Sequence, residues 1–496
     1  MSENHQIEQF NIENPERIYR GYGLTSHNIA DVDSNDNIIF ERDSTSIDRY
    51  KSNAVSKEYC GIRSDSELSS ILNLVVSAIG GGCFRLPFIM YDGGIIVSFI
   101  CFLFVTICVA YSIDLLRSFV VDTKYFSFAL MTDTILGHHW LKVYAFSSFV
   151  IYVSMEVSYL TSIYHYIKDI FKSYTDSAMF YLIYFVLSML VEIFICFNIS
   201  KTEKMHLLSI VSISCFFLLL FSLIIFSLAA NFRGEVGPKF TSDNLFFPNI
   251  NPDTTINRLF RISCYLTEFV FSYSYQSTFP TIIGNLKNVT QTNTQKVHLI
   301  SFGIVFGAYF LTAIFGFIMS TKVPNEIFKD FDDENFKGGW AYFIIPYTIV
   351  LCGYLLTLVP IRYIVIRDNF ITLYGEKKMT FKKEVLVISV FIVICNILVF
   401  CVELFDSSLE YLNIKSILLT LGGMFGVIIS FFLPVVNYIS VNGKRKIKSL
   451  IGYVITGFFL IVGLLSTINS FYQIFVGNNP MKDNVKYNFY KINLYK

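Results

Sequence analysis

Two breaks in long apolar segments are the features of this 496-residue chain most able to do chemistry. A glycine triplet at 80–82 interrupts the segment 68–92, and a polar run of Ser, Tyr, Gln and Thr at 272–278 interrupts the segment 262–284. Backbone groups without partners cost several kcal/mol each in lipid, so irregular backbone survives there only inside protein or along a cavity. Paired breaks of this kind are typical of the binding sites of transporters.

The glycine triplet could hold a carboxylate. An unwound turn exposes backbone N–H groups at the start of a half-helix, where the helix dipole and the free donors favour an anion. Glycine allows close approach because it has no Cβ. The carbonyl and hydroxyl groups of the polar run could accept hydrogen bonds from an ammonium group. The alternatives are a packing notch at the glycines and serines that bond only to their own helix backbone.

Ionisable side chains inside the apolar segments form a second set of candidates: Arg85, Glu156, Glu192 and Glu268. A charge at the bilayer centre costs about 2.5–3.5 kcal/mol on insertion scales, so it normally faces a cavity or a partner. Arg85 could pair with Glu156 or with Glu268, in an ion pair that is either structural or functional. Glu192 is close enough to a segment end to reach the lipid headgroups.

A polar stripe surrounds one of these carboxyls. Ser148, Tyr152, Glu156 and Tyr159 are separated by four, four and three positions, which places them on one face of a helix. We expect that face to look inward.

The elements that must position these residues are membrane helices. The chain is 53% hydrophobic and only 16% charged, and its net charge of +1 argues against a nucleic-acid partner. Its cysteines have no spacing that would hold a metal, and we expect neither a metal nor another cofactor. Segments of about 20 apolar residues occur at 68–92, 95–116, 141–165, 179–197, 207–230, 262–284, 298–320, 341–361, 385–404, 414–438 and 450–472.

These segments predict an all-α polytopic membrane protein with 11 transmembrane helices. The broken segments are the first and the sixth, so the first ten form two sets of five. An odd number in each set inverts one relative to the other, which makes a five-plus-five inverted repeat followed by helix 11. Residues 1–67 are polar and are expected to form a disordered cytosolic tail, 68–472 the transporter domain, and 473–496 a short C-terminal tail.

Basic residues predict the orientation. With the N-terminus in the cytosol, the cytosolic loops carry more Lys and Arg than the opposite loops, including clusters at 362–383 and 444–448. This is the distribution that the positive-inside rule requires.

Several motifs resemble the amino acid/auxin permease family, whose members include sodium-coupled neutral amino acid transporters and vacuolar amino acid transporters. The stretch from Asn73 to Phe88 is similar to that family's Asn…Gly-x-Gly…Leu-Pro signature, and the stretches 269–274 and 286–290 are similar to its vacuolar branch. Val359-Pro360-Ile361-Arg362 and Phe431-Phe432-Leu433-Pro434 also match. The resemblance covers about 68–472.

Departures from the family pattern leave the substrate open. Tyr275-Gln276 replaces a common Cys-His, and Asn285 replaces a Glu. Val76 stands where the sodium-coupled branch has an Asn that contributes to its cation site, and a valine side chain offers no oxygen ligand.

The resemblance implies a secondary active transporter, or symporter, of the APC superfamily that moves neutral or cationic amino acids by alternating access. The amino acid zwitterion would bind at the two breaks, and the candidate substrate-binding residues are Ser77, Gly80, Gly81, Gly82, Tyr152, Phe271, Ser272, Tyr273, Ser274 and Gln276. The candidate ion-coupling residues are Glu156, Glu268, Arg85 and Thr357. We expect proton coupling or facilitated exchange, because Glu156 and Glu268 could bind and release a proton, although Thr357 could contribute to a residual sodium site.

Other functional classes fit less well. A membrane enzyme would show a nucleophile or a His/Asp set near mid-helix, and a channel would show repeated polar rings. The alternative is an amino acid sensor without transport activity on the same fold, which sequence alone does not separate from a transporter. The expected location is the plasma membrane or a vacuolar or endolysosomal membrane.

Overall fold

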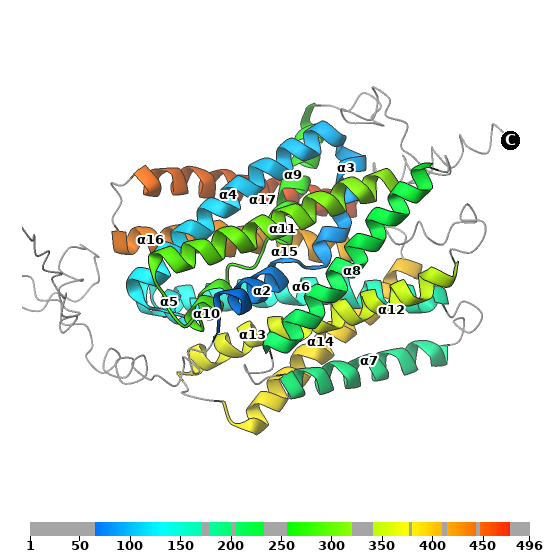
Figure 1. Cartoon of the computed structure of the whole chain (residues 1–496), viewed down its shortest axis with the longest axis horizontal. Helices are drawn as coiled ribbons and strands as arrows, with labels where there is room; N and C mark the ends of the chain where they lie inside the picture. The colour runs from blue at the N-terminus through cyan, green and yellow to red at the C-terminus, as the bar shows by residue number, and fades with distance from the viewer. Residues whose placement is uncertain are drawn as a thin grey trace, which may run out of the picture.

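The computed structural model describes residues 65–170, 178–199, 205–232, 255–319, 341–375, 379–408, 414–442 and 447–476. These residues are helical apart from short connections and one isolated bridge between Asp65 and Leu286. Eight of the described helices are long and apolar enough to cross a membrane. Most helices run roughly along the long axis of the molecule, with α2 (Glu67–Ala78) in the middle of the view (Figure 1). The all-α polytopic architecture predicted from the sequence is confirmed.

Each expected segment corresponds to one helix or to one interrupted helix. In chain order these are α2 with η2 (Gly81–Arg85) and α3 (Leu86–Gly93); α4 (Ile95–Thr123); α6 (His138–Ile170); α7 (Ala178–Ile199); α8 (Met205–Phe232); α9 (Thr255–Ser272) with α10 (Phe279–Gly284); α11 (Gln291–Met319); α12 (Ala341–Thr357) with α13 (Val359–Tyr374); α14 (Phe381–Ser408); α15 (Ile414–Val427) with a π-helical turn (Ile428–Phe432) and α16 (Leu433–Asn442); and α17 (Ile447–Val476).

Both predicted breaks are present. Helix α2 ends at Ala78, and Ile79 and Gly80 are extended before η2 begins. Helix α9 ends at Ser272, and α10 starts at Phe279. Proline lies in the first turn of each following helix, where its missing N–H costs nothing and its fixed φ suits helix initiation.

Three features of the helices differ from the sequence expectation. The eighth segment does not end at 361, because α13 begins at Val359 and continues to Tyr374. Pro360 therefore starts a new helix instead of ending the membrane segment. The tenth is interrupted by the π-helical turn just before Pro434, whose ring cannot join a regular α-helical ladder. An additional short helix, α5 (Phe128–Leu136), lies between α4 and α6 and is followed by the C-cap residue Gly137.

The expected tails fall largely outside the described residues, which begin at 65 and end at 476. Helix α17 continues past the expected end at 472 to Val476. At the other terminus, the Asp65 N–H donates to the Asn285 carbonyl at 3.2 Å, and the Lys287 N–H donates to the Asp65 carbonyl at 3.1 Å. Lys296 of α11 pairs with Glu67 at 2.7 Å. The start of α2 is therefore tied to α10 and α11.

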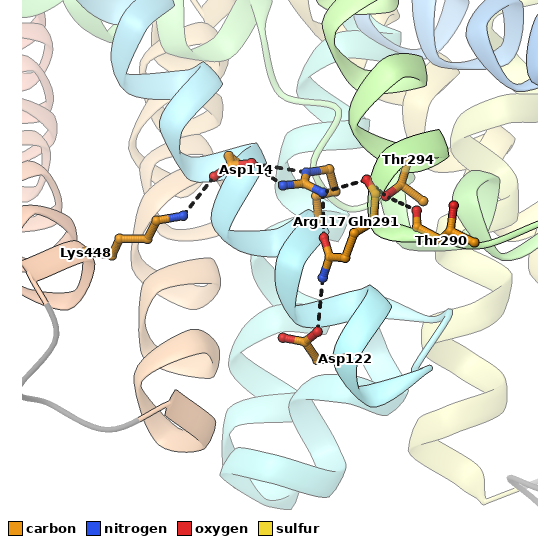
Figure 2. Close-up of polar contacts among 7 residues, drawn as sticks. All are labelled: Asp114, Arg117, Asp122, Thr290, Gln291, Thr294 and Lys448. Atoms are coloured by element: carbon orange, nitrogen blue, oxygen red, sulfur yellow. Dashed lines mark hydrogen bonds and ion pairs between the residues drawn. The ribbon is translucent and has the colours of Figure 1, made fainter. Parts of the chain in front are cut away.

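A polar network joins three helices at this same end of the bundle (Figure 2). Asp114 of α4 accepts a hydrogen bond from Arg117 at 2.7 Å and lies 3.4 Å from the Lys448 ammonium of α17. Arg117 also donates to the side chain of Gln291, the first residue of α11, at 2.7 Å. The Gln291 amide donates in turn to Asp122 at 3.0 Å. The network fixes the end of α4 against the starts of α11 and α17.

Glycines bring α15 close to α9. A Cβ at Gly422 would lie 2.6 Å from the Phe271 ring, and a Cβ at Gly426 would lie 3.2 Å from the Ser274 hydroxyl. Gly303 and Gly307 of α11 have the same spacing, but a Cβ at either position would meet nothing within 4 Å. Only the α15 pair is therefore needed for close packing, and it packs against the break in α9.

The two glycine pairs should therefore respond differently when a glycine is replaced by alanine. Gly422→Ala should destabilise the purified protein by about 1–3 kcal/mol, because the added methyl overpacks the contact with Phe271. Gly303→Ala is the matched control and should be neutral or stabilising, since Ala is a better helix former. Thermal denaturation in detergent measures both, and equal melting temperatures would contradict the assigned packing.

Candidate functional site

A cavity lies between the two broken helices and is closed on its third side by α6 and α13. It is lined by Val76, Ser77, Ala78, Gly80, Gly82, Tyr152, Met155, Tyr159, Phe271, Ser272, Ser274, Thr278, Leu358, Ile361 and Arg362. Of the predicted substrate-binding residues, the lining includes Ser77, Gly80, Gly82, Tyr152, Phe271, Ser272 and Ser274.

The glycines of the first break are required by close neighbours. A Cβ at Gly80 would collide with the Tyr159 hydroxyl of α6, and a Cβ at Gly82 would lie 2.6 Å from the Ser272 hydroxyl of α9. Helix η2 starts at Gly81, and the first N–H groups of a helix have no partner within it. Gly80 and Gly82 thus line the cavity at the start of a helix, where a larger side chain would collide with Tyr159 or Ser272.

Two tyrosines satisfy the carbonyl groups released by the breaks. The Tyr309 hydroxyl of α11 lies 2.6 Å from both the Ala78 and the Ser272 carbonyl oxygens. The Tyr354 hydroxyl of α12 donates to the Ile79 carbonyl at 2.5 Å. Both tyrosine side chains are fully buried. Tyr309 thus joins the two broken helices through a single hydroxyl group.

The serines that line the cavity donate to their own helices. The hydroxyl of Ser77 bonds to the Asn73 carbonyl at 2.7 Å, and that of Ser272 bonds to the Glu268 carbonyl at 2.9 Å. Ser274 does the same. The serine hydroxyl protons are therefore used within their own helices, as the alternative interpretation of the polar run expected. Their oxygen lone pairs remain available as acceptors along the cavity wall.

Tyr273 and Gln276 contact neighbouring helices and not the cavity. The Tyr273 hydroxyl lies 3.1 Å from Thr106 of α4, and the side-chain oxygen of Gln276 accepts a hydrogen bond from Ser430 at 3.0 Å. Both side chains are buried. The sequence places them in the polar run correctly, but the unwound backbone turns them toward other helices. Ser274 and Thr278, from the same break, do line the cavity.

Two buried or half-buried ion pairs connect the helices that line the cavity. Arg85 lies 3.3 Å from Glu268, which is one of its two expected partners. Glu156 pairs instead with Arg362 of α13, and both of those side chains are almost completely buried. The Arg362 guanidinium also lies 3.9 Å from the centre of the Tyr159 ring. Each pair therefore joins two different helices beside the cavity.

Two interpretations from the sequence are wrong here. Arg362 is not part of a basic loop, because α13 continues through it and buries it. Glu192 does not reach the headgroups, because its side chain is fully buried within the helix bundle. Two features of the sequence indicated that the helix continues through Arg362. One is the apolar run that follows this residue, and the other is the match of Val359 to Arg362 with the family pattern.

The candidate sodium ligands have other partners. Val76 is buried and lines the cavity with an apolar side chain. The Thr357 hydroxyl donates to the Tyr354 carbonyl at 2.6 Å. The Ala78 and Ile79 carbonyls each accept a hydrogen bond from a tyrosine, as described above. Val76 therefore offers no oxygen ligand for a hard cation at this place.

Two helices broken beside one cavity, within a bundle of membrane helices, are typical of a transporter fold. Comparison with known proteins agrees. The structure of MhsT in complex with L-phenylalanine is similar, with a TM-score of 0.51 and 15% sequence identity, over 83% of this chain and 99% of that chain. Residues 63–476 match the family described as "Transmembrane amino acid transporter protein", and the chain belongs to that family. Comparison with curated protein sequences gives no match.

The tyrosine contacts generate a prediction with an internal control. Tyr309→Phe should destabilise the protein by about 1–3 kcal/mol, because the Ala78 and Ser272 carbonyls lose their donor in a buried place. Tyr275→Phe should be neutral, because the buried Tyr275 hydroxyl makes no hydrogen bond to the described residues. Thermal unfolding of both variants in one detergent makes the comparison. Equal stability would show that the carbonyls do not depend on Tyr309.

Proposed function

We propose that this protein moves neutral or cationic amino acids across a membrane by alternating access. The observation that carries the proposal is the cavity between the two helix breaks, which brings backbone donors and oxygen acceptors together. Membership of the amino acid transporter family supports the substrate class.

The geometry suggests how a zwitterion would lie in the cavity. Its carboxylate would face the N–H groups at the start of η2, close to Tyr159 and Arg362. Its ammonium group would face the hydroxyl oxygens of Ser272 and Ser274 on the opposite wall. Met155 and Phe271 would contact the substrate side chain.

We also propose that the N-terminus is cytosolic, which puts the start of α2 and the network in Figure 2 on the cytosolic side. The distribution of basic residues supports this orientation. The membrane would be the plasma membrane or a vacuolar or endolysosomal membrane.

Uptake of labelled amino acids into proteoliposomes tests transport. The parent protein should accumulate or exchange at least one amino acid, whereas Gly82→Leu should lose nearly all uptake, because the new side chain fills the space next to Ser272. Gly303→Leu is the matched control and should transport normally, since its side chain meets open space. Amino acid binding without flux under any gradient would favour the sensor. Normal uptake by Gly82→Leu would move the site elsewhere.

The coupling ion is the finer part of the proposal. Proton coupling or facilitated exchange is favoured over sodium symport, because Val76, which lines the cavity, offers no oxygen ligand for sodium. Glu156 and Glu268 are carboxyls on two of the helices that line the cavity, and they could exchange a proton when their arginine partners move.

Replacing sodium by choline at fixed membrane potential should leave uptake unchanged, and varying the external pH should change it. Glu156→Gln and Glu268→Gln separate the two ion pairs: loss of the pH response in one variant identifies the pair that exchanges the proton. Strong sodium dependence without any pH response would contradict proton coupling.

A further inference from the structure

Glu192 is a buried carboxyl that does not line the substrate cavity. Ile183, Leu187, Leu190 and Phe194 form the exposed apolar face of α7. Glu192 projects from the opposite face, because its position differs from theirs by about half a helical turn. Its side chain has no exposed surface. A carboxyl in such a place must have its charge compensated or must hold a proton.

The direct partner of Glu192 is a neutral amide. The side-chain N–H of Asn396 in α14 lies 3.3 and 3.5 Å from the two carboxyl oxygens. The same amide nitrogen donates to the Ile392 carbonyl at 3.0 Å, and its oxygen accepts a hydrogen bond from Ser188 at 2.8 Å. All hydrogen-bonding groups of the Asn396 amide therefore have partners, and the amide gives the Glu192 carboxyl only one long hydrogen bond. That hydrogen bond does not neutralise a buried negative charge.

Glu192 lies close to the pair formed by Glu156 and Arg362. The charged group that acts on Glu192 itself is Glu156 of α6, and Glu156, Glu192 and Arg362 all act on the Cys395 thiol of α14. Cys196, one turn further along α7, is affected by both carboxyls and lies near Tyr363 of α13, which in turn has Arg367, Asp368 and Glu384 around it. Arg362 is already paired with Glu156. No ion pair among the described residues includes Glu192.

The Arg362 guanidinium thus compensates Glu156, whereas Glu192 beside that pair has only the neutral Asn396 amide. If both carboxyls were ionised, the group would carry an uncompensated buried charge, and one proton removes it. A second observation points to the same conclusion: the Oε1 atom of Glu156 is buried and has no hydrogen-bond partner among the described residues, so it is an unused acceptor next to Arg362.

We propose that Glu156, Arg362 and Glu192 form a proton-binding triad, with the proton on Glu192 while Arg362 is paired with Glu156. The inference rests on the proposed transport function and identifies the residues that couple it to protons. The proton enters from water on one side of the membrane and leaves to water on the other. Only its bond to a carboxyl oxygen forms and breaks.

The triad also links the proton to the substrate. Arg362 lines the cavity, and a substrate carboxylate at η2 would lie near its guanidinium. With the proton bound, the triad is neutral and accepts that carboxylate; without it, the triad is negative and repels it. Substrate and proton therefore strengthen each other's binding by the same factor. This is the relation that symport requires.

The test compares Glu192→Gln with the parent in proteoliposomes and in a binding assay. The substitution keeps the size of the side chain and removes the titrating group. In the parent, the apparent affinity for the transported amino acid should rise as the pH falls, and adding that amino acid to weakly buffered protein should take up protons. Glu192→Gln should lose both effects and still exchange amino acids. Glu384→Gln, at the distant start of α14, is the matched control and should retain both effects.

The outcomes separate the two proposals. If the parent protein shows no flux, or flux that does not depend on pH, the proposed proton-coupled transport is contradicted. A parent with pH-dependent flux and a Glu192→Gln variant with the same pH dependence contradicts the triad alone. If Glu192→Gln does not fold, Glu192→Leu/Asn396→Leu replaces both polar partners by apolar ones, which is close to neutral for stability. Persistence of substrate-driven proton uptake in that double variant would equally overturn the proposal.

Discussion

The structure depends on one constraint, which is that no backbone polar group can be left without a partner inside a membrane. Breaking α2 and α9 releases carbonyl groups at Ala78, Ile79 and Ser272. Buried tyrosine hydroxyls from α11 and α12 bond to them. Because the carbonyls are satisfied by neighbouring helices, the breaks can persist and the N–H groups at the start of η2 can face the cavity. A ligand with a carboxylate is the natural partner for those donors.

Charge balance imposes a second constraint on the same region. Arg85 and Glu268 compensate each other between η2 and α9, and Arg362 and Glu156 do so between α13 and α6. Each pair connects two of the helices that line the cavity, so under the proposed alternating access a movement that separates these helices would also expose a charge. Helix motion would then be connected to proton binding. In the proposed triad, Glu192 holds the proton beside the second pair.

The sequence predicts the fold well because its strongest signals are local. Apolar length defines the membrane helices, and the glycine triplet and the polar run mark the two breaks. The tyrosines that stabilise those breaks are not predictable in the same way, since Tyr309 and Tyr354 lie in regular helices and look like ordinary core aromatics. Arg362 follows a proline and precedes other basic residues, which is also the pattern of a loop. Only the packing of α13 against α6 shows that it is a buried partner of Glu156.

The central claim is that the backbone at the first break binds the substrate carboxylate. Hydrogen exchange of the amides at 80–82, measured by mass spectrometry on purified protein with and without a saturating transported amino acid, tests it most directly. The account predicts strong protection of these amides when the amino acid is present, because it binds their N–H groups and closes the cavity over them. Unchanged exchange at 80–82, together with protection at another part of the protein, would contradict it.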